Sequence, residues 1–144
     1  MKYIIQLILL LCALNFYSQG KIKMDPVKNI MNSSFVLFTA DNSGCFGGEI
    51  IIYKLVKQKN GDWKVTYKKA GKEESKKLKS KDYAAFIKNF SVSRERFKDP
   101  DAVKQTCTSV SVFSLSAGKD SLAFKNVTCQ GEFNPEFFLI GKLK

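Results

Sequence analysis

Apolar and polar positions in the first half of the chain follow the two-residue period of β-strands. Phe35–Thr39 is apolar on both faces, which is typical of a central strand, and Glu49–Lys57 is rich in Ile, Tyr and Val. Trp63–Lys69 alternates strictly, with large apolar residues on one face and Lys or Thr on the other. The Asn, Asp, Ser and Gly residues of segment 40–48 predict a loop between the first two strands.

The pair Asn60-Gly61 predicts a hairpin turn, and the length of that turn decides which strand face is buried. A two-residue turn would place Ile52 on the face of Trp63. A three-residue loop that includes Asp62 would place Tyr53 there instead, and we favour it because it gathers the aromatic side chains. This second register makes neighbours of the lysines on the opposite face: Lys54, Lys64 and Lys68.

A helix is expected after a charged connector over residues 71–79, with Ser80 as its cap. Its apolar residues recur at i, i+3, i+4 and i+7, so they predict an amphipathic helix with a buried stripe. That stripe consists of Tyr83, Phe86, Ile87 and Phe90. A short helix is also expected around Val27–Met31, and Asn134-Pro135 opens a last element that is either helix or strand.

Two further strands are expected at Thr108–Ser116 and Ser121–Cys129, joined by a turn at Ala117–Lys119. The order is then strand, strand, strand, helix, strand, strand, with no second long helix for a parallel sheet. This order predicts an α+β fold: an antiparallel sheet of about five strands with one main amphipathic helix packed on it. The alternative is a small barrel that wraps round the helix.

The first twenty residues have the layout of a secretory signal peptide. Lys2 gives a positive start, residues 4–16 form an apolar run, and Ser18-Gln19-Gly20 has small residues at its first and third places. We therefore expect residues 1–20 to be removed and residues 21–144 to form a single exported domain, periplasmic or secreted, without a membrane span. The alternatives are an uncleaved anchor or a buried first helix.

Export makes disulfides the default state of the remaining cysteines, because the compartment is oxidising. Cys12 leaves with the signal peptide, and three cysteines remain. A three-residue turn at Ala117–Lys119 would place Cys107 directly opposite Cys129, which predicts a disulfide between them. Pairing of either one with Cys45 is the alternative, since connectivity cannot be read from sequence.

The chain has 144 residues and no histidine, which removes the usual catalytic and metal-binding arrangements. Cys45 lies in a glycine-rich loop over residues 43–48, but nothing near it in sequence is an activating base. The loop does not match the phosphate-binding glycine motif, and three cysteines without histidine make a poor zinc site. We therefore expect a protein that is not an enzyme and needs no cofactor or metal.

The formal charge of +11 is concentrated in one part of the chain. Residues 54–98 contain fifteen basic and five acidic residues, a net charge of +10. A concentrated positive region attracts anions, such as an anionic polymer, lipid headgroups or an acidic protein. The alternative is that these basic residues form only a solvated surface that keeps the protein soluble. Five lysines are the candidate binding residues: Lys64, Lys68, Lys76, Lys77 and Lys79.

Cys45-Phe46-Gly47, followed by an Ile/Tyr strand, a Gly-containing turn and the segment Trp63–Tyr67, resembles a family of small exported bacterial domains. Those domains carry Cys-Phe-Gly-x-Cys-Pro before a strand, a turn, a Val-Thr-Tyr strand and a helix. Here Glu49 and Ile50 stand where that family has its second cysteine and proline. The resemblance covers residues 35–90 and implies an exported bacterial protein with a compact sheet-plus-helix domain. The family has no established activity to carry over.

Taken together, these patterns predict a small, exported, non-enzymatic binding or interaction module. Its basic region would contact an anionic partner of the envelope or the extracellular space. The alternative is a protein-binding inhibitor or envelope accessory protein that uses the glycine-rich Cys45 loop as its contact.

Overall fold

The computed structural model describes residues 25–43, 48–69, 71–98, 110–127 and 133–141. These residues form six strands and three helices. The strands are β1 (Phe35–Ser43), β2 (Glu49–Lys57), β3 (Trp63–Lys69), β4 (Lys72–Leu78), β5 (Val110–Ala117) and β6 (Asp120–Asn126). The helices are α2 (Pro26–Asn32), α3 (Ser80–Arg96) and α4 (Pro135–Ile140). The predicted signal peptide and all four cysteines lie outside the described residues.

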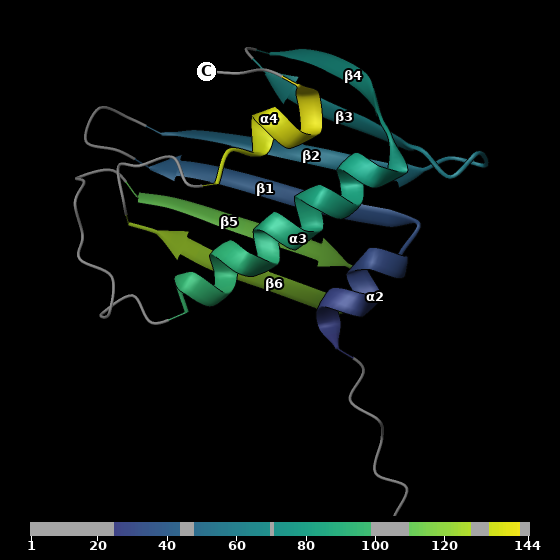
Figure 1. Cartoon of the computed structure of the whole chain (residues 1–144). Helices are drawn as coiled ribbons and strands as arrows, with labels where there is room; N and C mark the ends of the chain where they lie inside the picture. Colours follow the sequence, from purple (N-terminus) through teal and green to yellow (C-terminus); the bar gives the residue numbers. More distant parts are fainter. Residues whose placement is uncertain (1–24, 44–47, 70, 99–109, 128–132, 142–144) are drawn as a thin grey trace, which may run out of the picture.

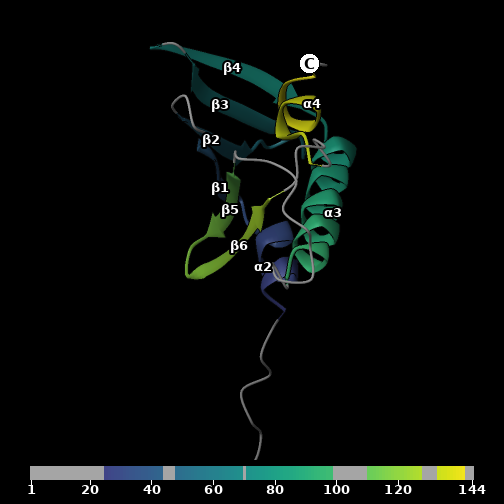
Figure 2. The same cartoon turned by 90° about the vertical axis from the view of Figure 1, so that its left-hand side faces the viewer.

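The six strands form one antiparallel sheet in the order β4-β3-β2-β1-β5-β6 (Figure 1). The three helices lie on one face of this sheet, and no described element covers the other face (Figure 2). The predicted antiparallel sheet with helical packing is therefore confirmed. The prediction of about five strands with one main helix is wrong, because strands dominate and three helices share the covering layer. The sheet is open between the edge strands β4 and β6, so the described residues form no barrel.

The segment predicted as a charged connector is in fact strand β4. Its residues are exposed apart from Leu78, so the segment has no apolar alternation that could predict a strand. It is held by its backbone ladder with β3 and by a hydrogen bond between the hydroxyls of Thr66 and Ser75, whose oxygens are 3.1 Å apart. An edge strand needs only one partner, and charged side chains on it discourage pairing with other chains.

The hairpin between β2 and β3 buries the face that we favoured. Tyr53 pairs with Tyr67, so the aromatic residues of both strands lie under the helices. The predicted three-residue loop is wrong, however, because the ladder ends at the pair of Lys57 and Trp63 and leaves residues 58–62 as the connection. The predicted and observed registers differ by two residues, so they bury the same face. Gly61 has a φ of 87° there, a left-handed conformation that glycine adopts without strain.

The hairpin between β5 and β6 has a two-residue turn rather than the predicted three-residue one. Ala117 pairs with Asp120 across Gly118-Lys119, and Gly118 has a φ of 59°. A one-residue change in turn length shifts every cross-strand pair. The argument that placed Cys107 opposite Cys129 is therefore wrong, although both cysteines lie outside the described residues.

The core between the sheet and the helices is mainly aromatic. Phe38, at the centre of the sheet, is fully buried and lies among several other rings. Its neighbours are Tyr53, Phe86, Phe90, Phe113 and Phe133, with ring centroids 5.2 to 6.2 Å away. The predicted α3 stripe is confirmed, since all four of its residues are buried.

Two contacts of Tyr83 join elements that are distant in sequence. Its ring stacks on Trp63 with centroids 3.8 Å apart, which ties α3 to β3. Its hydroxyl donates a hydrogen bond of 3.0 Å to the carbonyl of Ile30, which ties α3 to α2. Both residues of the stack are buried, so this contact holds the first turn of α3 against β3.

Each of the two short helices begins with a side-chain cap, which was predicted for Asn134-Pro135 and not for Asp25. Asp25 caps α2 by accepting a bond from the amide of Val27, and Asn134 caps α4 by accepting from the amide of Phe137. In both helices proline follows the cap, where its missing amide costs nothing. The last element is therefore a helix, and it ends at Gly141. None of the helices in the described ranges is long and apolar enough to cross a membrane.

Candidate functional site

The face of the sheet away from the helices, called here the open face, carries exposed apolar side chains. They come from alternate residues of the strands whose other residues form the core. Their exposed fractions range from 39% to 62%, for Phe35, Ile50, Ile52, Val56 and Val112. Contiguous exposed apolar residues on a folded protein are typical of binding surfaces.

Lysines lie beside these apolar residues on the open face. The strand register places Phe35, Val56, Lys64 and Lys77 in one row across four strands. In the next row Lys54 lies between Leu37 and Thr66. The charged residues of this face are Lys54, Lys64, Lys68, Lys77 and Lys125, with Asp41 and Glu73 as the acidic ones.

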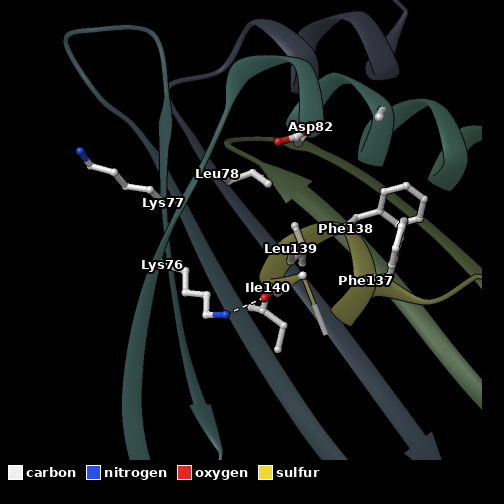
Figure 3. A pocket seen from close by; sticks show the side chains of 10 residues that line it. Lys76, Lys77, Leu78, Asp82, Phe137, Phe138, Leu139 and Ile140 are labelled. Atoms are coloured by element: carbon white, nitrogen blue, oxygen red, sulfur yellow. Dashed lines mark hydrogen bonds between the residues drawn. The ribbon is translucent and has the colours of Figure 1, made fainter. Parts of the chain in front are cut away.

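Three of the five predicted binding lysines lie together on the open face, and two do not. Lys64, Lys68 and Lys77 lie on this face, on β3 and β4. Lys76 projects from the other side of β4, and Figure 3 shows it and Lys77 pointing in opposite directions. Lys79 lies between β4 and α3, where it is the N-cap residue of the helix.

Lys76 links β4 to α4. Its ammonium donates a hydrogen bond of 2.7 Å to the carbonyl of Ile140, in the last turn of α4 (Figure 3). A cation at a helix C-terminus compensates the partial negative charge of the free carbonyls. A pocket of about 540 Å³ lies beside this contact, lined by β4, by Asp82 and Ala85 of α3, and by the apolar side chains of α4. Lys76 therefore has a structural role on the helix side of the sheet.

Lys54 and Lys125 are open-face lysines that the predicted set omitted. Lys54 could be found from the favoured hairpin register, which already placed it beside Lys64. Lys125 could not be found in this way, because the predicted turn of the second hairpin was one residue too long. Most of the glycine-rich Cys45 loop lies outside the described residues.

Three tyrosines of the described residues have raised pKa values. Tyr67 donates a hydrogen bond to the carboxylate of Glu74, and this bond raises the pKa of Tyr67 to about 12. Burial raises the pKa of Tyr53 and Tyr83 as well. All three phenols are therefore protonated at neutral pH and act as hydrogen-bond donors or core residues. Within the described ranges, no cluster of three or more Cys, Asp or Glu could hold a metal ion.

These tyrosines predict a loss of stability in alkali. A phenol whose pKa is higher in the folded chain contributes stability below its ordinary pKa of about 10, and this contribution is lost as the pH rises towards the folded value. We expect the free energy of unfolding in urea to fall between about pH 10 and pH 12, together with the appearance of phenolate absorbance. Tyr67→Phe should reduce this dependence, and an unchanged pH profile in that variant would contradict the role of Tyr67.

No protein-family model matches the chain, and no curated protein is significantly similar to it.

Proposed function

We propose that this protein is a non-enzymatic binding module that holds an anionic partner against the lysines of the open face. The observation that carries the proposal is the gathering of Lys54, Lys64, Lys68 and Lys77 on adjacent strands β2, β3 and β4. Adjacent strands are about 4.8 Å apart, so these ammonium groups act on one ligand together. The proposal includes export to the envelope or the extracellular space, as the N-terminal sequence and the resemblance to small exported domains indicate.

The pairing of Lys64 with Lys77 supports an anionic partner. These residues are directly opposite one another on β3 and β4. Like charges in opposed positions of an antiparallel pair destabilise the sheet. A bound anion would relieve this repulsion. Glu73 lies opposite Lys68 and compensates charge at the other end of β4.

Salt-dependent retention on a heparin matrix tests this proposal. Each lysine near an anionic surface contributes about 1 kcal/mol, so a variant with Lys64, Lys68 and Lys77 changed to Gln should bind roughly a hundredfold more weakly. The control changes three exposed lysines of the helical layer to Gln: Lys28, Lys81 and Lys88. Both variants have the same net charge. Elution of the two variants at the same salt concentration would mean that total charge, rather than the open face, causes retention.

The Cys45 loop stays a predicted second contact, and no observation on the described residues favours it. If the open-face variant and the control variant are retained equally, this loop becomes the next surface to test.

A further inference from the structure

We propose that the partner of the open face is an acidic amphipathic helix of another protein, which lies along β1 and β2. This inference rests on the proposed function and names the class of partner. It is carried by the arrangement of three kinds of side chain on the face: an apolar stripe, four of the five lysines within the stripe or on its β3 and β4 side, and mainly small residues on the β5 and β6 side.

The apolar stripe runs along two neighbouring central strands. It is formed by Phe35 and Leu37 on β1 and by Val56, Ile52 and Ile50 on β2. Phe35 pairs with Val56 at one end, and Ile50 pairs with Asp41 at the other. Six residue steps along β1 span about 20 Å, which corresponds to a helix of about 13 residues.

The two flanks of the stripe differ in chemistry. On the side of β3 and β4 lie Lys64, Lys68 and Lys77, and Lys54 lies within the stripe, between Val56 and Ile52 on β2. On the side of β5 and β6 most side chains are small, namely Ser114, Ser116, Ser121 and Ala123, and the exceptions are the pair Val112 and Lys125 at one end. An amphipathic helix with acidic residues on one flank matches this asymmetry, because its acidic flank would face the lysines and its other flank would lie on the small residues.

The covered face of the same sheet already packs against a helix. There α3 packs its stripe of Tyr83, Phe86, Ile87 and Phe90 against strands of the sheet. A second helix on the open face would give a sheet covered on both sides, which is a stable layer arrangement.

Two other occupants fit the observations less well. A second copy of this chain would place one lysine-bearing face against another, which like-charge repulsion opposes. An anionic bilayer is broad and flat, and would favour lysines spread evenly around the stripe, whereas four of the five lysines of this face lie on β2, β3 and β4. These occupants become outcomes of the test.

Selection from a displayed library of random 14-residue peptides tests the inference. We expect enriched peptides to have apolar residues at i, i+3, i+4 and i+7 with Asp or Glu on one flank. The best peptide should bind the protein at least tenfold more tightly than a peptide of the same composition in shuffled order. Enrichment without acidic residues or helical spacing, or equal binding of the shuffled peptide, would overturn the inference.

Substitutions on the stripe separate this inference from the proposed function. Ile52→Ser and Val56→Ser should each weaken binding of the best peptide at least fivefold and leave elution from heparin unchanged. If both variants bind the peptide normally, the helix does not lie on the stripe, even where the heparin result supports an anion-binding face. Amide chemical shifts of the unsubstituted protein give a second measurement, and changes confined to α3 and α4 would also overturn the inference.

Two further measurements test an anionic bilayer and a second copy of the chain as occupants of the open face. Vesicles of phosphatidylglycerol should bind no more weakly to Ile52→Ser than to the unsubstituted protein, because the inference assigns the stripe to a helix. Sedimentation should show a monomer when no peptide is present. Stripe-dependent vesicle binding without any peptide binding, or a dimer that Ile52→Ser disrupts, would replace the helix with the bilayer or with a second copy.

Discussion

Phe38→Ala is expected to lower the free energy of unfolding by about 3–5 kcal/mol, the usual range for loss of a buried phenylalanine. Phe38 has no exposed surface and contacts rings from strands β2 and β5, from α3 and from Phe133. A domain of this size has a total stability of about 5–15 kcal/mol. The variant should therefore lose a large share of its stability, because the rings around the cavity belong to different elements and cannot all move inwards.

Urea unfolding followed by the fluorescence of Trp63 measures this effect, since Trp63 is the only tryptophan and is buried. Phe137→Ala is the matched control, because the Phe137 side chain is 48% exposed on α4. It should cost about 1 kcal/mol or less. If the two variants lose equal stability, the sheet and the helices do not share one core centred on Phe38.

The elements with apolar periodicity could be predicted from the sequence. The stripe on α3 and the alternation on β3 have physical causes that act within a few residues, namely the helical and strand periods. The face of the first hairpin could also be predicted, because burying Tyr53 and Tyr67 with Trp63 selects the face, although it does not select the length of the loop. β4 could not be predicted in this way, since its strand state depends on a backbone ladder with β3 that leaves no mark on its own side chains.

The candidate site could be predicted in part for the same reason. The sequence shows that the positive charge is concentrated in residues 54–98, but adjacent lysines on a strand point to opposite faces. Lys76 and Lys77 are neighbours in sequence, yet one bonds to α4 and the other lies on the open face. The exposure of the apolar stripe was not predicted, because the apolar residues of Phe35–Thr39 indicate a central strand without showing which of its faces is covered. Which face of a central strand stays uncovered depends on where the helices pack, and local sequence does not determine this.

Reversing the charge of the open face should abolish binding to anions without unfolding the protein. Changing Lys54, Lys64, Lys68 and Lys77 to Glu converts a positive surface into a negative one. Four lysines contribute about 4 kcal/mol together near an anionic surface, so their loss alone corresponds to a nearly thousandfold weaker affinity. Repulsion by the new carboxylates adds to this effect. Retention on heparin should therefore disappear even at low salt.

The fold should tolerate this reversal because all four side chains are exposed and none belongs to the core. Circular dichroism should stay close to that of the unsubstituted protein, and the urea midpoint should fall only modestly, because Lys68→Glu places a carboxylate opposite Glu73. The matched control reverses four lysines of the helical layer and its edges to Glu: Lys28, Lys81, Lys88 and Lys98. It has the same net charge, so it should keep much of its retention if position on the sheet matters. Equal loss in both variants would show that the anion responds to the charge of the whole molecule, and the open face would lose its assigned role.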